Sequence, residues 1–200
     1  MKQLILASQS PRRNELLSQI GYQFITQSAD IDESVKDNEN AQDYVVRLAR
    51  EKAQKVFSAL SVKQQSQSVV LGSDTSVVID GDILGKPAHE AECIATLMRL
   101  ESKQHQVFTA IAAIESNRTV CELVETQVQF KALTIDEIKR YWQTGEPCDK
   151  AGSYGIQGIG GQFVTTINGS YSSVVGLPLY ETAQLLAKVG LPSSIEENSA

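Results

Sequence analysis

The first seventeen residues constrain this chain most, because they join a short apolar run to a polar turn and then to an amphipathic segment. The apolar run at residues 4–7 predicts a buried strand. Ser10 suits the N-cap of a helix, since its hydroxyl can accept a hydrogen bond from an unpaired amide of the first turn. Pro11 suits the first helical position, where its missing N–H costs nothing. We therefore predict a strand, a tight turn and a helix in this order.

Two arginines, Arg12 and Arg13, follow directly at the start of this predicted helix. The free amides and the positive dipole end of a helix N-terminus attract anions, and guanidinium groups beside them are suited to phosphate. The same pair would also be unremarkable as solvated surface charges on an ordinary strand–helix junction. Local sequence leaves both interpretations open.

The net charge of -6 excludes a general affinity for nucleic acid or for an anionic membrane surface. Any phosphate site must then be a local basic pocket in an acidic protein. No apolar run is long enough to span a bilayer, and no signal-peptide core is recognisable at the N-terminus. The cysteines, Cys93, Cys121 and Cys148, are scattered without a C-x-x-C pair, which argues against a disulfide framework or a zinc site. We expect a cytoplasmic protein.

The length of 200 residues suits one domain, or one domain with two lobes. Strands and helices are predicted to interleave, and the Asp80-Gly81 and Asn168-Gly169 pairs indicate hairpins that make the sheet mixed. The fold class is therefore α/β. The expected strands are 22–26, 69–72, 77–79, 83–84, 105–114, 119–130, 163–167 and 171–175; the expected helices after the first are 40–60, 89–101, 134–145 and 177–190; polar loops are expected at 27–40 and 61–68, and an irregular glycine-rich segment at 149–163.

Several kinds of active site can be set aside. Ser8 and Ser10 lack the G-x-S-x-G setting of a nucleophile elbow. The two histidines, His89 and His105, are not spaced as metal ligands. The sequence contains no Walker A motif, and its glycine-rich segment does not follow a predicted strand and open a helix as a dinucleotide-binding loop would. Covalent catalysis is the weaker class of mechanism.

What remains is a set of cations and a set of carboxylates. The cations lie at breaks between predicted elements or on an apolar face: Arg12, Arg13, Lys52, Lys86 and Lys150. Lys52 either extends to the surface or reaches into a polar cleft. Asp74 either caps its own loop or acts on a ligand at the carboxyl ends of strands, where Ser8 and Thr75 are also expected. Glu33, taken alone, resembles a solvated loop carboxylate. Carboxylates facing a triphosphate would suggest bound Mg²⁺.

Eight segments in order resemble the Maf family of nucleoside triphosphate pyrophosphatases. They are LASQSPRRNELL (6–17), DES (32–34), RLAREKA (47–53), GSDTSVV (72–78), LGKP (84–87), HQVFTAIA (105–112), DKAGSYGIQGIGGQFV (149–164) and INGSYSSVVGLPLYET (167–182). The resemblance implies an α/β/α, inosine triphosphatase-like fold with a mixed sheet and a cleft between two lobes. Residues 1–192 would form this single domain, with a flexible tail at 193–200, and the protein would be a homodimer.

The resemblance also implies roles for particular residues. Asp74 would accept the proton of the attacking water and, with Glu33, hold a Mg²⁺ or Mn²⁺ ion. Lys52 and Lys86 would act on the phosphates in catalysis, and Ser8, Ser10 and Arg13 would bind them. Arg12, Thr75 and Gln157 match the positions that select the base. The reaction would cleave a nucleoside triphosphate between its α and β phosphates.

The form AGSYGIQG at 151–158 resembles the branch of the family that acts on dTTP and UTP. A neutral Gln157 offers a donor and an acceptor to the O4/N3–H edge of uracil or thymine, and modified pyrimidine nucleotides would also be substrates. Two alternatives stay open: a 7-methyl-GTP pyrophosphatase, whose branch carries Glu where this chain has Gln157, and a non-enzymatic, nucleotide-sensing regulator of cell division or septum formation. A nucleic-acid-binding module fits less well, because the basic residues are dispersed.

Overall fold

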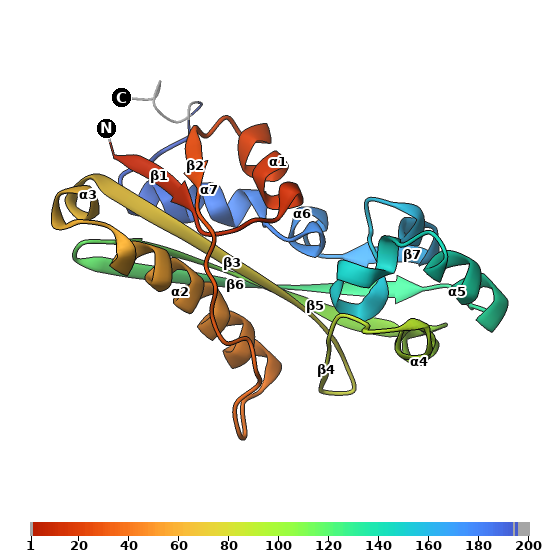
Figure 1. Cartoon of the computed structure of the whole chain (residues 1–200). Coiled ribbons are helices and arrows are strands. Elements are labelled where there is room, and N and C mark those ends of the chain that lie inside the picture. Colours follow the sequence, from red (N-terminus) through yellow and green to blue (C-terminus); the bar gives the residue numbers. More distant parts are fainter. Residues whose placement is uncertain (1, 194, 196–200) are drawn as a thin grey trace. The chain divides into compact units, whose positions relative to one another are not determined.

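The computed structural model describes residues 2–193 and 195, and within these residues the strands form one seven-stranded mixed sheet (Figure 1). The strand order is β2-β1-β3-β5-β6-β7, with β4 paired to β3. The strands are β1 (Gln3–Leu6), β2 (Phe24–Thr26), β3 (Ser68–Ile79), β4 (Asp82–Leu84), β5 (Gln104–Glu115), β6 (Arg118–Phe130) and β7 (Val164–Asn168).

The helices interleave with these strands, which confirms the α/β class. They are α1 (Pro11–Gln19), α2 (Ala41–Ala59), α3 (Val62–Gln67), α4 (Glu90–Leu100), α5 (Ile135–Trp142), α6 (Tyr171–Val175) and α7 (Leu179–Lys188), with short 3₁₀ helices η1 (Glu146–Asp149), η2 (Ala151–Ser153) and η3 (Ile159–Phe163). Across the described part of the chain, none of these helices combines the length and the apolar character needed to cross a membrane.

The chain divides into two compact units. The first unit comprises residues 1–74, 109–124 and 176–200, and the second comprises 75–108 and 125–175. The boundary falls within β3, between Asp74 and Thr75. The tail predicted at 193–200 lies outside the described residues, apart from Ser193 and Ile195.

The first unit is built on a parallel pair, β1 and β3, with Leu6 opposite Leu71. Both leucines are fully buried. Helix α2 packs directly against β3, as Figure 1 shows, because Gly72 has no side chain: a Cβ placed there would lie 2.2 Å from the carbonyl oxygen of Ala49. The helix begins where the sequence predicts, since Asn40 accepts a hydrogen bond from the amide of Asp43. This close packing brings α2 to the middle of β3.

The second unit contains the predicted hairpin and an aromatic core. Asp80 and Gly81 have φ of 54° and 86°, the two left-handed residues that a type I′ turn between β3 and β4 requires. The core includes edge-to-face contacts among aromatic rings, with Phe130 against both Tyr154 and His105. Helix α5 starts with the predicted capping box of Thr134. Local sequence signals are therefore sufficient to predict the β3–β4 turn and the start of α5.

Three predictions of helices, strands and loops are wrong. Residues 61–68 are not a loop but contain α3, which starts with a capping box between Ser61 and Gln64. The strands predicted at 69–72 and 77–79 are one continuous strand, β3, because Ser73 and Asp74 between them are buried and hydrogen-bonded, to the Gly176 carbonyl and to Lys52, rather than solvated. The second half of the predicted hairpin at 163–175 is helix α6, since Ser170 accepts the amide of Ser173 on its hydroxyl and that of Val174 on its carbonyl.

Candidate active site

The register of β1 and β3 determines which predicted residues lie together in the first unit. β1 ends at Leu6, opposite Leu71, whereas β3 continues for eight more residues, to Ile79. Asp74 is therefore not at the carboxyl end of its own strand, as predicted, but within it. It nevertheless lies just beyond the level at which β1 ends and the chain turns through Ser8. Asp74 lies near the turn through Ser8 because its neighbour β1 ends early, and not because β3 ends there.

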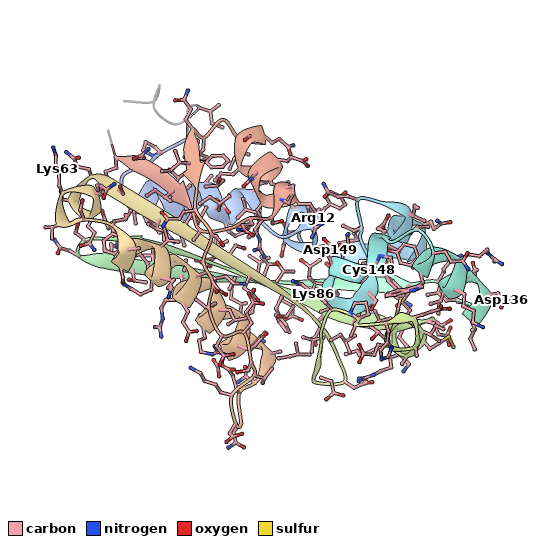
Figure 2. The ribbon with its side chains drawn as sticks, viewed as in Figure 1. Arg12, Lys63, Lys86, Asp136, Cys148 and Asp149 are labelled. Carbon is pink, nitrogen blue, oxygen red and sulfur yellow. The ribbon has the colours of Figure 1, made fainter. Side chains whose placement is uncertain are left out.

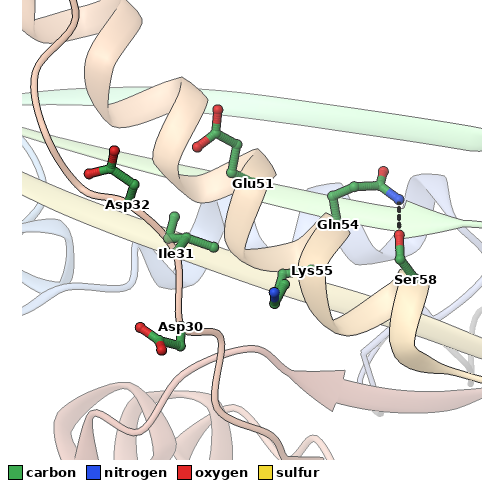
Figure 3. A pocket seen from close by; sticks show the side chains of 7 residues that line it. All are labelled: Asp30, Ile31, Asp32, Glu51, Gln54, Lys55 and Ser58. Carbon is green, nitrogen blue, oxygen red and sulfur yellow. Dashed lines mark hydrogen bonds between the residues drawn. The ribbon is translucent and has the colours of Figure 1, made fainter.

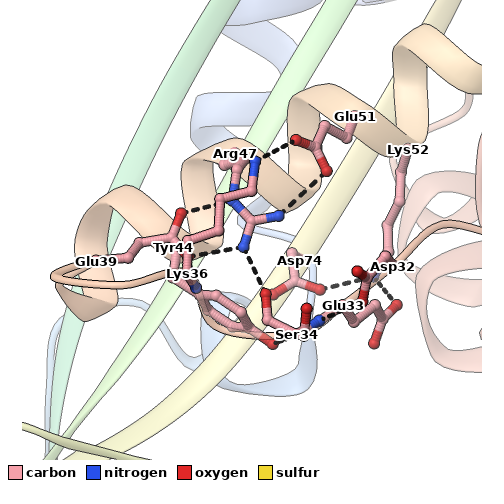
Figure 4. A network of polar contacts seen from close by, with 10 residues as sticks. All are labelled: Asp32, Glu33, Ser34, Lys36, Glu39, Tyr44, Arg47, Glu51, Lys52 and Asp74. Carbon is pink, nitrogen blue, oxygen red and sulfur yellow. Dashed lines mark hydrogen bonds and ion pairs between the residues drawn. The ribbon is translucent and has the colours of Figure 1, made fainter.

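Lys52 lies between two carboxylates (Figure 4). Its ammonium is 2.7 Å from Asp74 Oδ1 and 2.7 Å from Glu33 Oε1. Lys52 and Asp74 are both buried, with 9% and 7% of their surface exposed, so the lysine does not extend to the surface. Asp74 lies inside a regular strand and bonds to Lys52, which removes the interpretation that it only caps a loop. These three residues form what we call the acid–lysine cluster.

The surroundings of Asp74 change its protonation. Burial raises the pKa of Asp74 above its ordinary value of 3.8, and the positive charges of Lys52 and Arg13 reduce this effect without cancelling it. A raised pKa makes this carboxylate a better proton acceptor than a solvated aspartate. Burial also lowers the pKa of Arg13, against the opposing effect of the Asp74 charge. The guanidinium keeps its charge at neutral pH nonetheless.

Arg13 and Ser8 lie together where β1 leads into α1. Arg13 donates from Nε to the carbonyl oxygen of Gly176 at 2.9 Å and from a terminal nitrogen to Ser8 Oγ at 3.5 Å. Ser8 Oγ also accepts the backbone amide of Ser10 at 3.1 Å. Ser10 occupies the predicted N-cap position, but its side chain makes no capping hydrogen bond, so that part of the prediction is wrong. The Ser8 hydroxyl organises the turn instead.

The acidic loop that carries Glu33 is fixed by Arg47 of α2 (Figure 4). Arg47 contacts both carboxylate oxygens of Glu39, at 2.5 and 2.7 Å, and the carbonyl oxygen of Ser34 at 2.9 Å. The Tyr44 hydroxyl donates to the Glu33 carbonyl at 2.8 Å. The hydrogen bond from Arg47 lowers the pKa of Glu39 to about 2. Sequence reasoning missed Arg47, although an arginine on the helix that follows a carboxylate-rich loop was an available signal.

A pocket of about 660 Å³ opens beside this loop, between residues 30–32 and α2 (Figure 3). Its lining is mostly polar and charged: Asp30, Ile31, Asp32, Glu51, Gln54, Lys55 and Ser58. None of the predicted site residues lines it. We therefore assign the candidate site to the acid–lysine cluster with Ser8 and Arg13, and not to this pocket.

The remaining predicted residues are Arg12, which is half-buried in α1 of the first unit, and three residues of the second unit. Thr75 is half-buried and follows Asp74 in β3. Lys86 is exposed on the segment after β4 (Figure 2), whose Gly85 carbonyl accepts the amide of Gly152 at 3.1 Å. Gln157 is exposed within the glycine-rich segment.

The donor set of the acid–lysine cluster fits a hard divalent cation. Among the described residues, no group of three or more His, Cys, Asp or Glu side chains forms a complete metal site. Two carboxylates, Glu33 and Asp74, do converge on one positive charge, that of Lys52. Mg²⁺ commonly takes one or two protein carboxylates and completes its coordination with water and phosphate oxygens. The residues present therefore fit such an ion.

Fold and site together define an α/β protein in which a buried lysine–carboxylate cluster and an arginine–serine pair lie where the parallel strand β1 ends. The chain belongs to the Maf-like protein family, whose model matches residues 3–189. A protein from Colwellia psychrerythraea called "dTTP/UTP pyrophosphatase" is 62% identical over 97% of this chain and 92% of the relative. Proteins with the same name from Pseudoalteromonas atlantica and Hahella chejuensis are 56% and 50% identical, over 94% and 95% of this chain and 97% and 94% of the relatives.

Proposed function

We propose that this chain hydrolyses dTTP and UTP to the monophosphate and pyrophosphate, and accepts modified pyrimidine nucleotides. The observation that carries the proposal is the acid–lysine cluster, in which a buried carboxylate with a raised pKa is held by a lysine. The names of relatives at 50–62% identity over nearly the whole chain support the same reaction and substrates.

In this proposal Asp74 accepts a proton from the attacking water. The water oxygen forms a new bond to phosphorus as the anhydride bond between the α and β phosphates breaks, and pyrophosphate leaves. Lys52 holds the Asp74 carboxylate in place and offsets negative charge that develops on the phosphate oxygens. Arg13, Ser8 and Ser10 bind phosphate oxygens in the turn after β1. Lys86 contributes a further positive charge.

The proposal includes a divalent cation, Mg²⁺ or Mn²⁺, held by Glu33 and Asp74. When bound, such an ion neutralises charge on the triphosphate and polarises its oxygens. Lys52 occupies the position between the two carboxylates, and its four-carbon chain allows the ammonium to shift toward phosphate when a cation binds. In line with the family resemblance, we also propose that the protein is a cytoplasmic homodimer. Light scattering of the purified protein tests the dimer, and cell fractionation tests the location.

Base selection is assigned to Gln157, Arg12 and Thr75. Gln157 is exposed and neutral, so its amide can donate to O4 and accept from N3–H of uracil or thymine. The two bases differ only by a 5-methyl group, an apolar difference worth about 1–3 kcal/mol of discrimination. Acceptance of both bases, and of other 5-substituted pyrimidines, follows from this small difference.

A panel of nucleoside triphosphates with Mg²⁺ tests the proposal. We expect pyrophosphate and the nucleoside monophosphate as products, with UTP and dTTP preferred over CTP and the purine nucleotides. Release of orthophosphate, or a preference for 7-methyl-GTP, would contradict it. Nucleotide binding without any turnover would instead favour the nucleotide-sensing regulator.

A further inference from the structure

The carboxylate of Glu146, at the start of η1, accepts hydrogen bonds from three donors. Its Oε1 accepts the hydroxyl of Tyr141 at 2.8 Å and the backbone amide of Gly160 at 2.9 Å. Its Oε2 accepts the backbone amide of Ile159 at 2.7 Å. Tyr141 in turn accepts the amide of Gly155 on its hydroxyl at 3.1 Å. Both ends of the segment 155–160 are thereby attached to two side chains that precede it in the chain.

Two glycines of this segment lie directly against the ends of these two side chains. A Cβ placed at Gly158 would lie 2.3 Å from Glu146 Oε2, and one placed at Gly160 would lie 2.6 Å from the Tyr141 hydroxyl. Within the segment itself, the Gly158 amide donates to the Gly155 carbonyl at 3.2 Å. The glycines allow the backbone to approach the two side chains, and the hydrogen bonds then fix its path. Gln157 is on the exposed part of this fixed segment.

The adjacent amides of Ile159 and Gly160 form the kind of backbone concavity that binds anions, and here an internal carboxylate occupies it. Burial acts to raise the pKa of Glu146, but the hydrogen bonds from the Gly160 and Ile159 amides and from Tyr141 outweigh it, and the pKa is lowered below 4.5. The carboxylate therefore stays ionised, as an acceptor of hydrogen bonds and not as an acid.

We propose that Glu146, with Tyr141, is a positioning residue for base selection: it holds the segment 155–160 in the one conformation that presents Gln157 to the nucleotide base. This inference rests on the proposed role of Gln157 in reading uracil and thymine. It adds that the selectivity depends on an ion–amide contact made away from the base itself. No part of it requires Glu146 to touch the substrate.

The substitution Glu146→Gln tests this directly, because it keeps the length of the side chain. The glutamine side chain has one acceptor oxygen and one NH₂ group. Its NH₂ must therefore face the N–H of either Ile159 or Gly160, and two donors cannot form a hydrogen bond. We expect the exchange of these two amide hydrogens to become about tenfold faster. We also expect KM for UTP to rise about tenfold with kcat changed less than about threefold, and the preference for UTP over CTP to fall.

Asp136→Asn is the matched control, because Asp136 is an exposed carboxylate in the first turn of α5 (Figure 2). It should leave exchange, KM and selectivity unchanged. Fluorescence of Trp142, the one tryptophan of the chain, checks that each variant is folded. If Glu146→Gln does not fold, Tyr141→Phe carries the test, since it removes a donor to Glu146 and an acceptor for Gly155. It should produce the same rise in KM and loss of selectivity.

A parallel Gln157→Ala variant separates failure of this inference from failure of the proposed function. If Gln157→Ala loses the preference for UTP while Glu146→Gln and Tyr141→Phe keep it, Glu146 is not a positioning residue, although the proposed function stands. If Gln157→Ala keeps the preference, the base-reading role of Gln157 is wrong and the inference is overturned with it. Faster amide exchange with unchanged selectivity in Glu146→Gln would likewise overturn the inference.

Discussion

Lys52 and Asp74 form a buried ion pair, Nζ to Oδ1 2.7 Å, although one residue belongs to helix α2 and the other to strand β3. A buried charge is stable only when its partner stays in place, and removal of one partner typically costs about 3–5 kcal/mol. Here Glu33 offers Lys52 a second carboxylate at the same distance. This shared arrangement lets the role of Asp74 in the reaction be tested without leaving the lysine uncompensated.

Asp74→Asn should abolish turnover and leave nucleotide binding detectable. The amide is close in size to the carboxylate but accepts no proton, and general-base catalysis typically contributes about 10²–10⁴-fold to a rate. Pyrophosphate release measures the first effect, and calorimetric titration with a nucleotide measures the second. Asp80→Asn in the β3–β4 turn is the matched control, because asparagine tolerates its positive φ of 54°. Retained activity in Asp74→Asn would exclude Asp74 as the base.

The pH dependence of the metal-free protein should reveal the raised pKa of Asp74. Its carboxyl ¹³C signal should titrate with a midpoint above 3.8, while that of exposed Asp32, whose pKa is lowered by hydrogen bonds from Ser34, should titrate below 3.8. The folded state therefore binds the Asp74 proton more tightly than the unfolded state does. The stability gained from this proton is complete below pH 3.8 and is lost as the pH rises through the folded-state pKa.

Gln157→Glu should depress the hydrolysis of UTP and dTTP. The carboxylate loses the donor that Gln157 offers to O4 of the base, and we expect kcat/KM for both nucleotides to fall at least about tenfold. Gln143→Glu, an exposed substitution of the same chemistry just after α5, should leave the substrate profile unchanged. Rates with UTP, dTTP, CTP and 7-methyl-GTP measure the effect. An unchanged profile in Gln157→Glu would remove this residue from base selection.

Arg47→Lys should weaken the response to divalent cation more than it weakens the fold. A lysine cannot reproduce the paired contact with Glu39 and the additional bond to the Ser34 carbonyl, so the loop that carries Glu33 loses its main attachment. Partners that orient a metal ligand commonly change metal affinity by about tenfold or more. Activity measured against Mg²⁺ concentration gives the half-saturation point, which should rise by this factor. Arg50→Lys, exposed on the same helix, should not move it.

His105 should make the stability of the fold depend on pH. Burial lowers the pKa of His105 from 6.5 to about 4, so the folded state favours the neutral ring, which bonds to the Tyr154 hydroxyl at 2.9 Å. The resulting stability is complete above pH 6.5 and is lost as the pH falls toward 4, by about 3 kcal/mol in total. Urea unfolding at several pH values measures this loss. His105→Gln should flatten the dependence, and His89→Gln, at an exposed N-cap, should retain it.

Local signals were enough for much of the fold. The Asn40 cap, the Asp80-Gly81 turn and the Thr134 capping box each act through a few neighbouring residues, and the structure confirms all three. Strand β3 could not be predicted in this way. Ser73 and Asp74 looked like the end of a strand because their partners, the Gly176 carbonyl and Lys52, are distant in the sequence. Helix α6 was missed because Asn168-Gly169 favours a hairpin, and this signal outweighed the capping role of Ser170.

The candidate site likewise contains residues that local patterns could predict and residues that they could not. Residue patterns alone left Lys52 and Asp74 with two interpretations each, and only the contact between them decides the matter. Arg47 was signalled only by the carboxylate-rich loop before its helix, and Glu146 gave no clear signal, because both bind groups of irregular segments. Side chains that orient a site through such segments become visible only when the path of the backbone is known.

The absence of a side chain at Gly72 has a consequence for the chemistry of the site. The Ala49 carbonyl that a methyl group would strike belongs to the turn of α2 directly before Lys52, and Gly72 itself precedes Asp74 by two residues. A methyl group there would move the turn that carries the lysine away from the strand that carries the aspartate. The spacing between Asp74 and Lys52 therefore depends on a residue that makes no contact with either charge, and Gly72→Ala would alter the ion pair through the backbone alone.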